Sequence, residues 1–256
     1  MTPPSSRFES LRGDAELTLF PAISFAFQPI VDIKTKSVVA YEALVRGTAN
    51  QSAASIFEQV AAENLPRFDQ HCRSVAITLA QKLELPCKLN LNMIPNGSTT
   101  PQQSIRYTVE AAERTNLPLE RIVLEVAEGE VIEDHDRFTR ITNHYRSLGF
   151  KLAVDDFGAG HAGLNLLADF QPDQLKLDKQ LVWDIASKGP RQVIVRAIIQ
   201  ICYDLGIDLV AEGIETPEQY QWLASEGISL FQGYLLACPG FECFPPIAYE
   251  TLPQIV

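Results

Sequence analysis

The stretch SFAFQPIVDIKTKSVVAYEALVR, residues 24–46, contains two apolar and β-branched runs separated only by Lys34 to Ser37. Each run has the length and composition of a β-strand. So short a connection can join antiparallel strands, but it cannot hold the crossover that parallel strands need. We therefore predict that the first two strands of the fold are antiparallel.

After this hairpin the pattern changes to strand, helix, strand. The apolar runs are KLNLNMI, IVLEVAE, FKLAVDDF, QLKLD, IDLVAE and SLFQGYL, and segments with helical spacing, such as residues 191–205, lie between them. Alternating β and α units indicate a mostly parallel sheet covered by helices. The total of roughly eight strands predicts an α/β fold, a TIM-like (β/α)8 barrel with the first strand antiparallel to the rest. An open doubly wound sheet is the alternative that this pattern leaves open.

The composition indicates one globular unit. Hydrophobic residues make up 46% and charged residues 21% of the 256 residues, and no composition shift divides the chain. We expect a polar lead-in or linker at residues 1–21 and a single barrel domain at residues 22–256. No apolar run approaches the ~20 residues that span a bilayer, and the start MTPPSSRFES lacks signal-peptide regions. The expectation is a cytoplasmic protein without membrane insertion.

The net charge and the cysteines argue against a nucleic-acid-binding protein, a disulfide-rich protein and a zinc-knuckle protein. A formal net charge of −11 argues against binding of long nucleic acids, which requires many Lys and Arg contacts to phosphates. The five cysteines are odd in number and scattered without a CxxC pair, so we expect reduced thiols, with neither a disulfide framework nor a zinc knuckle.

Polar residues interrupt the predicted strands near their C-terminal ends, where buried parallel strands should be apolar. They are Glu42, Asn92, Glu125, Asp155, Asp156, Lys176, Glu212 and Gln232. Each alone is compatible with a structural role. In a barrel, however, these ends converge on one mouth, where active sites are built. Several carboxylates there would repel one another without cations, and oxygen ligands suit Mg²⁺ or Mn²⁺ better than Zn²⁺.

Two of these positions carry geometric information. Neighbouring side chains of a strand point to opposite faces, so Asp155 and Asp156 both reach the mouth only if the strand ends between them. Adjacent acids so placed can bridge two cations ~3.5–4 Å apart.

Lys176 lies among apolar neighbours, where an ammonium is costly unless acids surround it, and we expect it to orient a nucleophilic water. An ion pair with Asp178 is the structural alternative.

The ordered motifs resemble those of the EAL domain family. FQPIVDIKTKSVVAYEALVR contains the eponymous Glu42-Ala43-Leu44, and LNLNMIPN, EVAE, DDFGAG, QLKLD, VAEGIET and FQGYLLACP follow in the family order, over residues 25–239. The resemblance implies a bacterial phosphodiesterase that hydrolyses the second messenger cyclic di-GMP to linear pGpG with two divalent cations, Mg²⁺ or Mn²⁺. It also implies a homodimer formed near the loop Asp156–Gly160, and a sensor domain or partner outside this chain.

The resemblance also implies a role for each matching residue. The first metal would be bound by Glu42, Asn92, Glu125 and Asp155, and the second by Asp155, Asp156 and Glu212, directly or through water. The catalytic group would be Glu42, Lys176, Gln232 and Glu128, in which Lys176 and Gln232 hold the nucleophilic water and Glu128 anchors the Asp156–Gly160 loop. Substrate contacts would come from Gln28, Leu44 and Arg46, and from Asp178 and Glu215 as weaker candidates.

Three departures from the family pattern concern details rather than metal ligands. Ala127 stands where Thr is usual, His161-Ala162-Gly163 replaces Tyr-Ser-Ser, and Cys238 replaces a frequent Arg.

The alternative functions are a catalytically silent EAL-type cyclic di-GMP receptor or protein-interaction adaptor, and an unrelated metal-dependent barrel enzyme.

Overall fold

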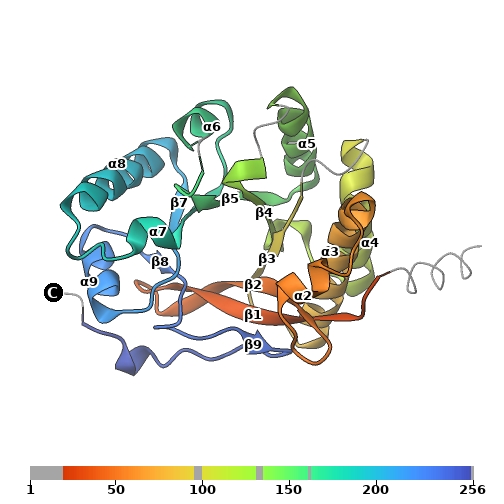
Figure 1. The fold of residues 1–256 in the computed structure, drawn as a ribbon, viewed down its shortest axis with the longest axis horizontal. Coiled ribbons are helices and arrows are strands. Elements are labelled where there is room, and N and C mark those ends of the chain that lie inside the picture. Colours follow the sequence, from red (N-terminus) through yellow and green to blue (C-terminus); the bar gives the residue numbers. More distant parts are fainter. Residues whose placement is uncertain (1–19, 95–99, 131–134, 161–162, 255–256) are drawn as a thin grey trace, which may run out of the picture.

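A closed eight-stranded barrel is the centre of the fold (Figure 1). The computed structural model describes residues 20–94, 100–130, 135–160 and 163–254. The barrel strands are β1 Ile23–Asp32, β2 Ser37–Gly47, β3 Lys88–Asn92, β4 Ile122–Ala127, β5 Lys151–Phe157, β6 Gln174–Leu177, β7 Asp208–Ala211 and β8 Leu230–Phe231. They are hydrogen-bonded in sequence order from β2 to β8, and β1 closes the ring between β8 and β2.

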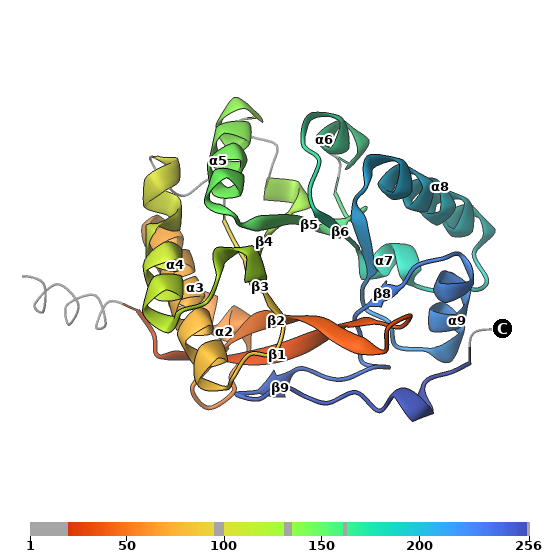
Figure 2. The same ribbon diagram turned by 180° about the vertical axis from the view of Figure 1, so that it is seen from behind.

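The strand directions confirm the predicted TIM-like barrel with a reversed first strand. β1 is antiparallel to both β2 and β8, whereas β2 to β8 are mutually parallel. A short ninth strand, β9 Gly240–Phe241, pairs with β1 at Ala26 and Phe27. It belongs to the C-terminal segment, which runs along the β1–β2 hairpin on one side of the ring (Figure 2).

Helices cover the rest of the outer surface of the barrel (Figures 1 and 2). They are α2 Ala53–Phe57, α3 Leu65–Lys82, α4 Pro101–Thr115, α5 His135–Leu148, α6 Gly163–Asp169, α7 Lys179–Val182, α8 Gly189–Leu205 and α9 Pro217–Ser225, with short 3-10 turns η1, η3, η4 and η5 at Ala62–Asn64, Leu119–Arg121, Glu128–Glu130 and Tyr249–Thr251. Their ends follow capping chemistry, since Thr216 and Gln219 form a capping box at α9 and Gly206 ends α8 with φ of 69°. None of the helices in the described ranges is both long and apolar enough to cross a membrane.

Successive side chains of each strand point alternately to the outside of the barrel, where the helices pack, and to its interior. Outward residues such as Phe27, Leu89 and Leu91 are buried in the main apolar core, which includes buried residues of the surrounding helices. Ile30, Ala40 and Val210 form a small separate apolar cluster. Glu42 is two residues beyond Ala40 on β2, and therefore lies on the same face as that cluster, closer to the C-terminal end of the parallel strands. We call this end of the barrel the mouth.

Candidate metal centre and active site

Lys176 is the centre of an ionic cluster in the mouth. Its side chain is 1% exposed, and its Nζ lies 3.2 Å from Glu42 Oε2, 3.0 Å from Glu125 Oε1, 3.2 Å from Asp155 Oδ1 and 2.5 Å from Glu212 Oε1. These acids come from β2, β4, β5 and the residue after β7, so barrel closure brings them together. Asp178, the alternative partner considered from the sequence, instead accepts a hydrogen bond from the Gln180 N–H at 2.8 Å and caps α7.

The acids form two groups that could each hold a divalent cation. One consists of Glu42, Glu125 and Asp155, and the other of Asp155, Asp156 and Glu212, with ligand atoms within 4.8 Å of one another in each group. Asp155 belongs to both groups, the arrangement that a two-metal site requires.

Unpaired oxygens support this fit. Glu125 Oε2 and Gln232 Oε1 are buried and have no hydrogen-bond partner within the described part of the chain. A buried oxygen without a partner is costly, and a cation or its water ligand would satisfy it. The hard oxygen donors suit Mg²⁺ or Mn²⁺.

The Asp155–Asp156 pair reaches the cluster by a different route from the one predicted. The strand does not end between the two residues, because β5 continues to Phe157. Instead, its register with β6 shifts between Val154 and Phe157, and Asp156 has a left-handed backbone with φ of 54°. Such an irregularity breaks the simple alternation of side chains, so both acids can serve one cluster.

Two amide side chains donate hydrogen bonds to Glu42. Asn92 Nδ2 donates to Glu42 Oε1 at 3.1 Å, and Gln232 Nε2 donates to Glu42 Oε2 at 2.7 Å. Gln232 also contacts Gln28 Oε1 at 3.3 Å, and Gln28 lies opposite Glu42 in the β1–β2 register. Asn92 and Gln232, predicted for metal and water contacts, therefore meet at one carboxylate, and Gln28, predicted for substrate, joins them through Gln232.

Asn90 is a residue of the cluster that the sequence reasoning missed. It is completely buried, and its Nδ2 donates to Glu125 Oε1 at 2.8 Å and to Gln174 Oε1 at 3.2 Å. The signal was present, because the alternation in KLNLN places Asn90 on the same strand face as Asn92.

Electrostatics in the mouth favour binding of a cation. Burial raises the pKa of Glu125 to about 8, although Lys176 opposes this, and burial with the charge of Asp155 raises the pKa of Asp156 to about 6. Burial also raises the pKa of Glu212 well above its ordinary value. Burial opposes the charge of Lys176, yet Asp155 and the other acids raise its pKa well above the ordinary value. The acids thus exceed what one lysine neutralises, and a divalent cation would relieve the excess.

Glu128 connects the end of β4 to the loop after β5. It is 1% exposed, and its Oε2 accepts hydrogen bonds from Gly158 N at 2.9 Å and from Gly160 N at 3.0 Å. Gly158 has φ of 98°, which glycine adopts without strain. The carboxylate is thus placed to hold the loop that follows Asp155 and Asp156.

The predicted substrate contacts lie at different places. Leu44 and Arg46 are half-buried at the end of β2 and line a cavity of about 250 Å³ together with Asn92. Glu215 is exposed after β7, as is Cys238 after β8. His161 and Ala162 lie outside the described residues.

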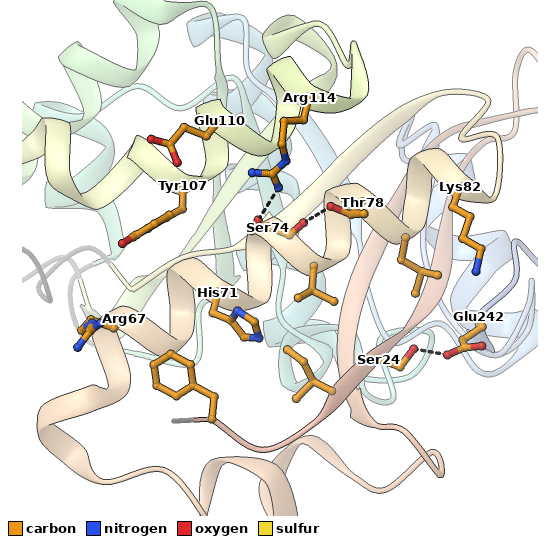
Figure 3. A pocket seen from close by; sticks show the side chains of 14 residues that line it. Ser24, Arg67, His71, Ser74, Thr78, Lys82, Tyr107, Glu110, Arg114 and Glu242 are labelled. Carbon is orange, nitrogen blue, oxygen red and sulfur yellow. Dashed lines mark hydrogen bonds between the residues drawn. The ribbon is translucent and has the colours of Figure 1, made fainter. Parts of the chain in front are cut away.

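A second cavity, of about 620 Å³, lies away from this cluster, between α3, α4 and the start of β1 (Figure 3). Val75 and Leu79 of α3 and Arg114 of α4 are among its lining residues. None of the predicted site residues lines it.

Comparison with known proteins agrees with the motifs. The EAL domain pattern matches residues 21–239. The chain is 36% identical over 243 residues to the blue light- and temperature-regulated antirepressor BluF of Escherichia coli (strain K12), covering 93% of this chain and 60% of BluF. It is 30% identical over 226 residues to the probable cyclic di-GMP phosphodiesterase PdeN of the same organism, covering 84% of this chain and 43% of PdeN. The chain thus spans less than two thirds of either relative.

A solved structure of a standalone versatile EAL protein from Vibrio cholerae O395, in its c-di-GMP bound form, has a similar fold. Its TM-score is 0.86 at 45% sequence identity, over 90% of this chain and 98% of that one.

Proposed function

The chain belongs to the EAL domain family, and on that premise we propose that it is a metal-dependent phosphodiesterase that hydrolyses cyclic di-GMP to linear pGpG. One observation carries the proposal: two acid groups that share Asp155 lie around a buried lysine. The similarity to PdeN and to a c-di-GMP bound EAL protein supports the choice of substrate.

The proposed metal ligands are Glu42, Asn92, Glu125 and Asp155 for the first cation, and Asp155, Asp156 and Glu212 for the second. Two bound divalent cations would neutralise phosphate charge and make a bound water nucleophilic near neutral pH. The oxygen atoms of these ligand residues would determine where the two cations lie.

Lys176 and Gln232 are the donors assigned to the nucleophilic water. Both contact the same atom, Glu42 Oε2, at 3.2 and 2.7 Å, so two hydrogen-bond donors converge on one point of the mouth. A water held by both donors would form a bond from its oxygen to phosphorus while one P–O3′ bond breaks, and one of its protons would pass to the 3′ oxygen. The 3′ oxygen leaves with a proton, and pGpG keeps the phosphate at its 5′ end. Lys176 remains charged and stabilises the charge that develops.

The substrate contacts are assigned to Gln28, Leu44 and Arg46, with Asp178 and Glu215 as outer candidates. Arg46 would provide a charge-assisted hydrogen bond to phosphate. The proposal further includes a cytoplasmic location and a homodimer formed near the Asp156–Gly160 loop. Light scattering, which measures the molar mass in solution, would test whether the chain is a dimer.

A second candidate function is binding of cyclic di-GMP without hydrolysis. The similarity to BluF favours it, because that relative is named an antirepressor rather than an enzyme. The retained acids and Lys176 favour hydrolysis.

One experiment separates the two candidates. The chain is incubated with cyclic di-GMP and Mg²⁺ or Mn²⁺, products are resolved by anion-exchange chromatography, and binding is measured by calorimetry in Ca²⁺. Asp155→Asn is the test variant, and Asp173→Asn, at an exposed ion pair with Lys151, is the control. Formation of pGpG by wild type and control but not by Asp155→Asn supports the enzyme. Binding of cyclic di-GMP without formation of pGpG supports the receptor. If the chain neither binds cyclic di-GMP nor forms pGpG, both functions are rejected.

A further inference from the structure

A buried ion pair lies on α3, outside the barrel wall. Arg73 is 2% exposed and Asp69 is 8% exposed, and Arg73 Nη1 donates to Asp69 Oδ2. Arg73 also donates from Nε to Thr108 Oγ1 at 3.0 Å and from Nη2 to Ser104 O at 2.9 Å. Arg73 thereby fixes Asp69 relative to α4.

Asp69 faces the end of β3, which carries a proposed metal ligand. With Arg73 it lines the cavity of about 250 Å³ that Leu44, Arg46 and Asn92 also line. Burial raises the pKa of the Asp69 carboxyl, and Arg73 and the backbone N–H of Ile94, two residues after Asn92, oppose this rise. Met93, between them, donates its N–H to Glu125 O at 2.9 Å. Of the two backbone groups after Asn92, the first is bonded to β4 and the second faces Asp69.

Stability alone is a weak reason to keep this pair. Burying two charges is costly, and apolar residues of similar volume are often equally stable or more stable in their place. The pair does, however, restrict the position of the backbone beside Asn92. Asn92 uses its Nδ2 for Glu42 Oε1, so its Oδ1 is the atom with which it would bind a cation.

We propose that Asp69, held by Arg73, is a positioning residue for the metal centre, which fixes the end of β3 so that Asn92 presents Oδ1 to the first cation. This inference rests on the proposed function, because it concerns the same metal centre. Asp69 acts through the Ile94 backbone and touches neither substrate nor metal.

The test replaces the pair by apolar residues of similar size, Asp69→Leu with Arg73→Met in one chain. This double variant leaves no unpaired buried charge, so it should fold, with a Tm close to that of Thr108→Val, because both variants lose the Arg73–Thr108 hydrogen bond. Its Mn²⁺ dissociation constant, measured by calorimetry without substrate, should rise by about 10–100-fold, as is typical when support of a ligand is lost. The control is Thr108→Val, which removes a completely buried partner of Arg73 and leaves Asp69 intact.

The expected result is that the double variant loses Mn²⁺ affinity, whereas Thr108→Val, of similar stability, keeps the Mn²⁺ affinity of the wild type. Equal Mn²⁺ affinity of the double variant and the wild type would overturn the positioning role and leave the phosphodiesterase proposal intact. A parallel loss of affinity and Tm in both variants would show general loosening and also overturn it. If wild type itself binds no Mn²⁺, the proposed function fails together with this inference.

Discussion

Replacing Lys176 by methionine tests the centre of the site, because the change keeps most of the side chain and removes only the ammonium. The four contacts of 2.5 to 3.2 Å would be lost from a group that is 1% exposed. Two unit charges ~4.8 Å apart repel by about 3 kcal/mol at an effective dielectric constant of about 20. Removing one partner of a buried ion pair costs about 3–5 kcal/mol. In EDTA we therefore expect a loss of stability of about 3–5 kcal/mol, part of which Mg²⁺ restores.

Turnover should respond differently from substrate binding. Loss of one donor to developing charge lowers kcat by about 10²–10³-fold, whereas KM for cyclic di-GMP should change little. Initial rates over a range of substrate concentrations give both constants, and circular dichroism in Mg²⁺ checks the fold. Lys151→Met is the matched control, since Lys151 pairs with Asp173 at 2.7 Å but its side chain is 47% exposed. This control should lose about 0–1 kcal/mol and keep wild-type turnover.

Two results would refute this reasoning. A wild-type kcat in Lys176→Met would exclude any role for the ammonium in the chemical step. A raised KM at unchanged kcat would show that Lys176 holds phosphate in the ground state instead.

Further predictions concern the ligands, the loop and pH. Glu42→Gln should lower turnover by orders of magnitude in a folded protein, and near-normal rates would remove Glu42 from the ligand set. EDTA should abolish pGpG formation and Mg²⁺ or Mn²⁺ restore it; chelation without effect contradicts the metal assignment. Glu128→Gln should raise the Mg²⁺ requirement by about 10–100-fold, whereas a small drop in Tm alone would indicate only a local structural role. In EDTA the Tm should fall as the pH rises from ~4 to ~8. The pKa of Glu125 is about 8 in the folded state, above its ordinary value in the unfolded state, so protonated Glu125 favours folding. This contribution to stability is lost as Glu125 ionises. Saturating Mg²⁺ should reduce this fall, and a Tm independent of pH in EDTA would contradict it.

The sequence by itself determined the α/β class and the direction of the strands, and it favoured a barrel over an open doubly wound sheet. The four-residue link before β2 excludes a parallel crossover, and the alternation of β and α units predicts the parallel strands that follow. Candidate residues were also readable, because a polar residue in an apolar run is visible without coordinates. Both signals are local in the chain, and local periodicity is what a sequence reports directly.

Only the tertiary structure decided how these residues meet. Lys176 contacts four acids from separate parts of the chain, and Asp155 belongs to both acid groups, because closure of the ring sets these distances. The register shift beside Asp156 was likewise absent from the sequence prediction, which assumed that the strand ended there. Asp69 and Arg73 are four residues apart on α3, but the contacts of Arg73 with Thr108 and Ser104 required the packing of α3 against α4. Such contacts join residues far apart in sequence, so the physical reason they could not be predicted is that no local pattern encodes the distance between two strands or helices.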